Sequence, residues 1–266
     1  MAKRPPSRTS RDETISAGTS LRLYRIPGIP EIRRGEDLGK CISDAARRAG
    51  ISFESGDILV IAQKIVSKAE GAVVRLTKIR PSQESLAIAA RLKKDPRAVE
   101  VVLKESRRIV RSYPVLIAET RHGFVCANAG VDHSNVPGDD AVTLLPRNPD
   151  RSAKKLAAAL RKRTSKHVAV IISDTFGRPW RLGLTNVAIG AAGLPVLLDL
   201  RGTRDRHGKL LTATVLAVAD ELAAAAGLLM GKSEGTPAVI IRGYRYKQKT
   251  QPAASIIRPA AEDLFR

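Results

Sequence analysis

Short apolar runs bounded by polar or glycine residues recur along this chain, and they predict buried strands. The clearest is the run of five apolar residues at 168–172, which is typical of a strand with both faces covered. Similar runs predict further strands at 21–26, 58–62, 115–119, 123–127, 196–200 and 238–241. Only Thr120-Arg121-His122 separates 115–119 from 123–127, which predicts a hairpin there.

Apolar residues at helical spacing lie between these runs and predict helices. The predicted helices cover 37–49, 82–93, a stretch that begins at 95, 150–163 and 212–230. Asp95 followed by Pro96 is a typical helix start, and Gly50 is a typical helix end. We expect Asp150 to cap the basic helix that follows it.

Both ends of the chain are basic and carry little apolar surface. We expect a disordered tail at 1–20 and a loose tail at 244–266, with the folded domain between them at 21–243. A chain of 266 residues is near the upper limit for one core, so one large domain or two intertwined subdomains are expected.

The composition excludes several classes of protein. Hydrophobic residues make up 43% of the chain, which is too many for a disordered protein. No apolar run approaches the roughly 18 residues of a membrane helix. The first 20 residues contain no hydrophobic segment of the kind that a secretory signal needs, so a cytoplasmic protein without membrane partners is expected.

The formal net charge of +20 indicates anionic partners. Nucleic acid is one alternative, but aromatic residues make up only 3% of the chain and no nucleic-acid motif of defined spacing occurs. Much of the charge falls on predicted helix surfaces. A solvated basic face therefore explains the charge better than a nucleic-acid footprint does.

The two cysteines and the four histidines form no recognisable ligand set. Cys41 and Cys126 lie far apart and make neither a CxxC motif nor a zinc spacing. Cys126 has apolar neighbours, so we interpret it as a buried, unreactive thiol.

Two polar segments follow predicted strands and carry the strongest chemical signal. Ser173, Asp174 and Thr175 come directly after the run at 168–172, and Arg178 lies just beyond. The second segment, 128–135, contains Asp132. Each alone is as consistent with an ordinary turn, but together they predict a shared site for Mg²⁺ or Mn²⁺, which prefer oxygen ligands and substrate phosphates.

A third segment, 63–71, follows the predicted strand 58–62 and contains Lys64, Ser67 and Lys68. These side chains could hold phosphate oxygens. The phosphate-loop pattern GxxxxGK[ST] is absent from the whole sequence. From the spacing alone, exposed lysines on a helical turn explain the segment equally well.

Four stretches carry a resemblance to a known family. They are GDILVIAQKIVSKAEG, HGFVCANAGVDHSNV, ISDTFGRPWRLGLTNVAIG and ADELAAAAGLLMGKSEGTPAVIIRG. With them, roughly 21–243 resembles the coenzyme F420-0:L-glutamate ligase family. The resemblance implies a mixed α/β (α+β) fold without a phosphate loop, with mixed sheets and with intertwined halves in a homodimer.

The resemblance also implies an activity. A member of this family joins L-glutamate to the lactyl carboxylate of coenzyme F420-0 through an acyl phosphate, with GTP as co-substrate and Mg²⁺ or Mn²⁺ as cofactor. Further γ-linked glutamate addition and a monovalent-cation requirement stay open.

The family's site residues carry over to matching positions of this sequence. The implied nucleotide contacts are Ile29, Pro30, Glu31, Ile32, Gln63, Lys68 and Asn135, and the implied metal ligands are Asp132, Asp174 and Thr175. Some members have a hydroxyl residue at the position of Gln63. Asp174 and Lys68 are the catalytic candidates, together with Arg178, which charge and position assign to the anionic substrate or the acyl phosphate.

Two alternatives to this function stay open at this point. One is an ATP- or GTP-dependent amide ligase that acts on another acidic metabolite. The other is a nucleic-acid-binding protein, for which the net charge is the only argument.

Overall fold

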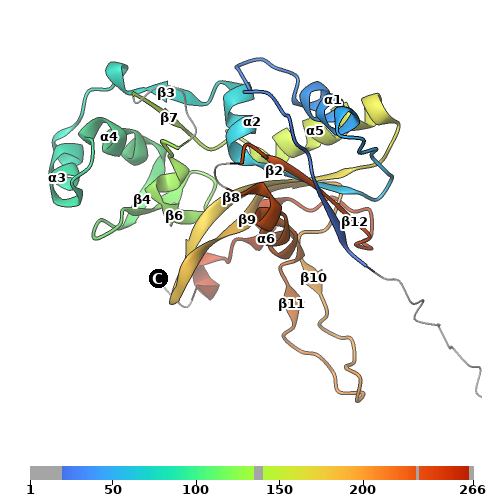
Figure 1. Cartoon of the computed structure of the whole chain (residues 1–266). Helices are drawn as coiled ribbons and strands as arrows, with labels where there is room; N and C mark the ends of the chain where they lie inside the picture. Colours follow the sequence, from blue (N-terminus) through green and yellow to red (C-terminus); the bar gives the residue numbers. More distant parts are fainter. Residues whose placement is uncertain (1–19, 135–139, 232–233, 264–266) are drawn as a thin grey trace, which may run out of the picture.

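A mixed five-stranded sheet forms the centre of the computed structural model, which describes residues 20–134, 140–231 and 234–263 (Figure 1). Its strand order is β1-β12-β2-β8-β9. Only β2 and β8 pair in parallel, and the other neighbours are antiparallel. The strands are β1 (Arg22–Arg25), β12 (Ala238–Arg242), β2 (Ile58–Ala62), β8 (Ala169–Arg178) and β9 (Arg181–Ala192). The expected mixed α/β fold is confirmed.

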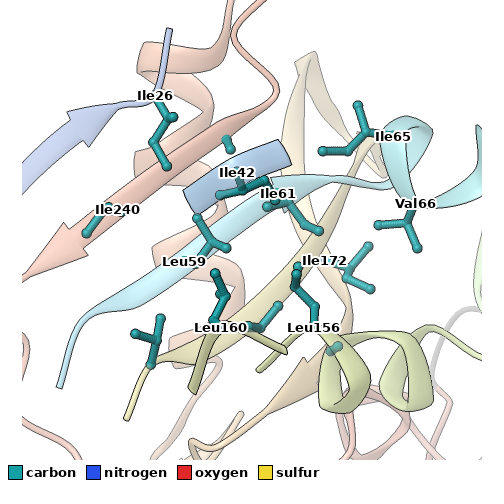
Figure 2. Close-up of a cluster of buried hydrophobic side chains, with 14 of the residues drawn as sticks. Ile26, Ile42, Leu59, Ile61, Ile65, Val66, Leu156, Leu160, Ile172 and Ile240 are labelled. Carbon is teal, nitrogen blue, oxygen red and sulfur yellow. The ribbon is translucent and has the colours of Figure 1, made fainter. Parts of the chain in front are cut away.

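Helices cover both faces of this sheet. Because successive side chains of a strand point to opposite faces, Leu59 and Ile61 of β2 enter one core while Ile58 and Val60 enter another. Figure 2 shows the first core, in which Leu59 and Ile61 lie with Leu156 and Leu160. The covering helices are α1 (Leu38–Arg48) and α5 (Pro149–Thr164) on the first face and α6 (Val218–Met230) on the second.

A smaller lobe at 73–144 has a core of its own, formed by residues such as Leu76, Val99 and Val142. Helix α2 (Gln63–Glu70) leads from β2 toward this lobe (Figure 1). The lobe contains β3 (Val73–Arg75), α3 (Gln83–Leu92), α4 (Pro96–Glu105), β4 (Ser106–Arg111), β5 (Ile117–Thr120), β6 (Val125–Ala127) and β7 (Ala141–Thr143). The predicted hairpin is the pair β5 and β6, and Asp95 caps α4 as expected.

The predicted strand end before Asp174 is wrong. Strand β8 continues to Arg178 because β9 supplies backbone partners along the whole polar stretch. Its pairing with β2 ends at Ser173, however. Asp174 and Thr175 therefore lie where the two-stranded β8–β9 ribbon leaves the sheet.

Asp150 does not cap α5, contrary to the prediction. The side chain of Asn148 accepts the hydrogen bond from the Arg151 amide at that helix end. The Asp150 carboxylate instead accepts hydrogen bonds from the amides of Ala191 and Ala253, each at 2.8 Å. It thereby ties β9 to the C-terminal segment.

The predicted helix at 212–230 begins later than expected, at Val218. The short strand β11 (Val215–Leu216) precedes it and pairs with β10 (Leu198–Asp199). Of the strand predicted at 196–200, only these two residues of β10 are in a strand. Together β10 and β11 form an arm that projects from the body (Figure 1).

The segment 244–263 is not loose. The Gln251 carboxamide oxygen accepts hydrogen bonds from the amides of Val196 and Leu197, at 3.1 and 3.2 Å. Ala253 is fully buried and opens the short 3₁₀ helix Ala253–Ile256. Basic residues are conspicuous in the sequence of this segment, but several of its apolar side chains pack in or against the second core.

Within the described ranges, no helix combines the length and the apolar composition that crossing a bilayer requires.

Candidate active site

A cavity of about 710 Å³ lies where the loop after β1, the start of α2, the β8–β9 ribbon and the end of α6 meet. It collects most of the residues that the sequence singles out, which come from segments far apart in the chain. The predicted residues that line it are Ile29, Pro30, Glu31, Ile32, Gln63, Lys68, Asp132, Asp174 and Thr175.

Two predicted site residues are not brought to this cavity by the described structure. Arg178 is exposed near the tip of the β8–β9 ribbon, where its guanidinium donates to the Leu182 carbonyl at 2.8 Å. It is not among the described residues that line the cavity. Asn135 lies outside the described residues, so its role stays a prediction.

Lys68 is a buried cation rather than an exposed lysine on a helical turn. Its residue is only 8% exposed, and its ammonium lies 2.5 Å from a carboxylate oxygen of Glu31. Lys68 belongs to the last turn of α2, and Glu31 to the loop that follows β1. The pair places a positive and a negative group at the wall of the cavity, where a phosphate could replace the carboxylate.

Gln63 begins α2 and is 1% exposed. Its carboxamide oxygen accepts a hydrogen bond from the Ser67 hydroxyl at 2.8 Å. Its amide nitrogen is buried and has no hydrogen-bond partner within the described part of the chain. Because an unpaired buried donor costs about 1–3 kcal/mol, this amide is suited to an acceptor on a ligand in the cavity.

Asp132 is held in place by a lysine and a serine. Lys64 lies 2.8 Å from its carboxylate, and the Ser134 amide and hydroxyl donate to it at 2.7 and 3.1 Å. Burial alone would raise the pKa of Asp132. The hydrogen bonds from Lys64 and Ser134 outweigh burial and lower the pKa, so the carboxylate is ionised at neutral pH.

Thr175 donates to the carboxamide oxygen of Asn186 at 3.0 Å, across the β8–β9 ribbon. Helix α6 approaches this pair closely because Gly227 has no side chain. A Cβ atom at Gly227 would lie 2.8 Å from the Asn186 amide nitrogen. The ribbon and α6 thus build one wall of the cavity together.

Cys126 lies near this wall and is unreactive, as the sequence indicates. The residue is buried, and burial, with the Asp174 carboxylate as a second cause, raises the pKa of its thiol to about 12. The thiolate that would act as a nucleophile or metal ligand is therefore not populated at neutral pH.

The donor set fits a hard divalent cation. No cluster of three or more His, Cys, Asp or Glu side chains occurs within the described ranges, so a closed all-protein metal cage is not present there. The oxygen donors that line the cavity include Asp132, Asp174, Thr175 and Asn186. Mg²⁺ and Mn²⁺ are typically bound by one or two carboxylates, with phosphate and water oxygens completing the shell.

Sequence reasoning missed several residues of the cavity. Asn186, Gly227 and Thr236 line it and were not singled out. Lys64 was named only as a possible phosphate ligand, and its contact with Asp132 has no local signal. The stretch GKSEG at 231–235 reads as a flexible loop, yet Gly231 and Gly235 line the cavity. Its small residues after a helix were the signal that could have placed it at a ligand.

Fold and cavity together define the class of this protein. It is an α/β protein whose cavity is lined by lysines suited to phosphate and by oxygen donors suited to a divalent cation.

Comparison with known proteins narrows the class. Residues 28–243 match the family model described as F420-0:Gamma-glutamyl ligase, and the chain belongs to this family of ligases.

Three relatives are each named coenzyme F420:L-glutamate ligase. The relative from Methanothermobacter thermautotrophicus is 48% identical, over 92% of this chain and 99% of its own length. That from Methanopyrus kandleri is 47% identical, over 93% and 98%. That from Archaeoglobus fulgidus is 40% identical, over 92% and 96%.

Proposed function

We propose that this protein joins L-glutamate to the lactyl carboxylate of coenzyme F420-0, with GTP as the phosphoryl donor. The observation that carries the proposal is the family match over 28–243, combined with a cavity that gathers Lys68, Asp132 and Asp174. The name that the relatives share, coenzyme F420:L-glutamate ligase, supports the two substrates. The lysines and oxygen donors of the cavity support a nucleotide with its cation.

The reaction needs an activated carboxylate, because a carboxylate has no leaving group that an amine can displace. The lactyl carboxylate attacks the γ-phosphorus of GTP, which forms an acyl phosphate and releases GDP. The amine of L-glutamate then attacks the acyl carbon, phosphate leaves, and the nitrogen loses a proton to give the amide. Such phosphoryl transfer depends on positioning and charge neutralisation more than on covalent help from the protein.

Each cavity residue has a defined part in this scheme. The Lys68 ammonium neutralises phosphate charge, and the buried Gln63 amide, which has no partner among the described residues, donates to a nucleotide oxygen. Asp132, Asp174 and Thr175 would hold Mg²⁺ or Mn²⁺, which withdraws charge from the phosphate oxygens when bound. Arg178 would contact the anionic substrate only if that substrate extends along the β8–β9 ribbon toward its tip.

A homodimer is part of the proposal. The β8–β9 ribbon exposes three large apolar side chains, with Trp180 79% and Leu182 99% exposed, and Leu184, which also lines the cavity, 67% exposed. Such a row is typical of a surface that a partner covers. We expect a second copy to cover it. Leu182→Glu should then shift the sedimentation coefficient to that of a monomer, whereas Leu86→Glu, on exposed α3, should not.

Mass spectrometry of the purified protein with F420-0, L-glutamate, GTP and Mn²⁺ tests the reaction directly. We expect a product that carries an added glutamyl group, with one GDP released for each. Asp174→Ala should lose ligation, while the control Asp44→Ala, which removes a surface carboxylate on α1, should keep it. No glutamyl product from the unmodified protein would overturn the proposed function.

The same assay separates the alternatives. Equal turnover with ATP would remove the GTP assignment but leave the ligase. Turnover of another acidic metabolite in place of F420-0 would indicate a different substrate. Tight filter binding of duplex or single strands, with a steep dependence on salt, would instead support the nucleic-acid alternative.

A further inference from the structure

We propose that Lys64 and the divalent cation compete for Asp132, and that nucleotide binding exchanges one for the other. This inference rests on the proposed function, because it requires Asp132 to be a metal ligand. The consequence is that the protein binds the metal poorly by itself and well together with nucleotide.

The first observation is the contact itself. The Lys64 ammonium lies 2.8 Å from a carboxylate oxygen of Asp132 and also contacts the Ser134 hydroxyl, which itself donates to the same carboxylate. Both Lys64 and Asp132 line the cavity. The ammonium therefore occupies coordination space that a cation on Asp132 would need.

An ammonium and a divalent cation on one carboxylate repel each other. In this partly buried place, solvent screens that repulsion less than on an open surface. The Lys64 side chain is 20% exposed. The metal can therefore bind Asp132 with its full affinity only if the ammonium moves away. The four-carbon stem of lysine allows such a move by rotation about side-chain bonds, without a shift of the backbone.

The second observation is what surrounds the pair. Lys64 and Lys68 lie one turn apart on α2, so both ammonium groups reach the same cavity. Each is neutralised by a carboxylate, Lys64 by Asp132 and Lys68 by Glu31. The two pairs leave these four groups with no net charge in the absence of ligand.

A nucleotide phosphate changes this balance. Its oxygens are an alternative partner for Lys64, and accepting the ammonium frees Asp132 for the metal that the phosphates also bind. Nucleotide and metal thus promote each other's binding, and linkage requires the effect to be equal in both directions. Lys64 is a positioning residue in this account, because it acts through Asp132.

Binding of Mn²⁺ alone and with a non-hydrolysable GTP analogue tests the exchange, with free Mn²⁺ measured by electron paramagnetic resonance. For the unmodified protein, the analogue should tighten Mn²⁺ binding about tenfold or more. Lys64→Met should bind Mn²⁺ about tenfold more tightly than the unmodified protein when no nucleotide is present, and should lose most of the gain from nucleotide. Lys64→Arg, which keeps the charge, should keep that gain.

A matched control is Lys40→Met, which breaks another lysine–carboxylate pair, at 3.1 Å to Asp44 on the surface of α1. Its Mn²⁺ affinity should not change. Lys64→Gln serves as a second neutral variant if Lys64→Met does not fold.

Two outcomes distinguish failure of the Lys64 exchange from failure of the proposed metal site. Unchanged or weaker Mn²⁺ binding by both neutral Lys64 variants, with Asp132→Ala still abolishing it, would overturn the exchange and leave the metal site intact. If the unmodified protein binds no Mn²⁺ even with the GTP analogue, the proposed metal site and the exchange both fall.

Discussion

Two ion pairs in this molecule have the same shortest nitrogen–oxygen distance but differ in how firmly they are held. Arg242 lies 2.8 Å from Asp57 at the end of β12, and Lys64 lies 2.8 Å from Asp132 in the cavity. Asp57 is 1% exposed, whereas the Asp132 side chain is 41% exposed. Distance alone therefore does not tell a permanent pair from an exchangeable one.

The difference lies in how many partners each cation has. The Arg242 guanidinium donates to both oxygens of Asp57, to Glu54 and to the Ser52 carbonyl, and it stacks over the Tyr24 ring at 5.2 Å. The hydrogen bonds to Asp57 raise the pKa of Arg242. Lys64 carries a single ammonium on a flexible stem, lines the cavity and contacts only Asp132 and Ser134 among the described residues. The Arg242–Asp57 pair fixes β12 to the turn before β2, whereas the Lys64–Asp132 pair can separate when another partner for Lys64 binds.

The largest effect should come from breaking the fixed pair. Arg242→Met leaves the Asp57 carboxylate buried without its cation, and we expect a loss of about 3–5 kcal/mol in the free energy of unfolding. Urea denaturation followed by circular dichroism measures it. Arg25→Met is the matched control, because its partner Glu234 is exposed. A loss no larger than that of the control would end the distinction between the two kinds of pair.

A carboxylate held by hydrogen bonds tests the same idea through pH. Glu100 accepts from the Ser82 amide and hydroxyl at 2.9 and 2.6 Å, and these bonds lower its pKa from 4.5 to about 2. Because the folded pKa lies below the unfolded one, this stabilisation is complete above about pH 4.5 and is lost as the pH falls toward 2.

Glu100→Gln should therefore be less stable than the unmodified protein by on the order of 1 kcal/mol at pH 7, with the gap closing between pH 4.5 and 2. Thermal unfolding of both proteins across that range measures the gap. A gap that stays constant with pH would mean that the charge of Glu100 does not carry the effect.

The exchangeable pair should contribute little to stability. Lys64→Met leaves Asp132 partly exposed and still bonded to Ser134, so we expect the free energy of unfolding to fall by less than about 1 kcal/mol. The same urea experiment measures it. A loss near that of Arg242→Met would show that the cavity pair is structural.

The smallest effect is expected at the surface. Lys40→Met breaks the Lys40–Asp44 pair on α1, and pairs of this spacing stabilise a helix by about 0.3–0.5 kcal/mol. Urea denaturation of the variant and the unmodified protein, in low and in high salt, measures the contribution of this pair to the free energy of unfolding. An effect above that of Lys64→Met would reverse the order that burial and partner number predict.

Local signals predicted much of the fold. Strand β2 and the first four residues of β12 are unbroken apolar runs, and Asp95 followed by Pro96 predicts a helix start. The extension of β8 through Asp174 was missed because its polar residues look like a strand end. Only the partner strand β9 makes them part of a sheet.

The site was predicted unevenly for the same reason. Resemblance to the family placed Lys68 and Asp174 at one cavity, which the structure shows them to line. The partners of these side chains depend on tertiary structure, and neither the Lys64–Asp132 contact nor the unpartnered Gln63 amide has a sequence signal. Likewise, Asp150 followed the pattern of a helix cap, but Asn148 two residues earlier holds that place.

The place of β12 in the sheet has a consequence for synthesis of the chain on the ribosome. Among the strands of the described residues it is translated last, yet it lies between β1, which is translated first, and β2. Until residue 242 emerges, β1 has no neighbour and the far side of β2 stays open. The backbone N–H and C=O groups on that side of β2 therefore stay unpaired in the nascent protein until β12 arrives.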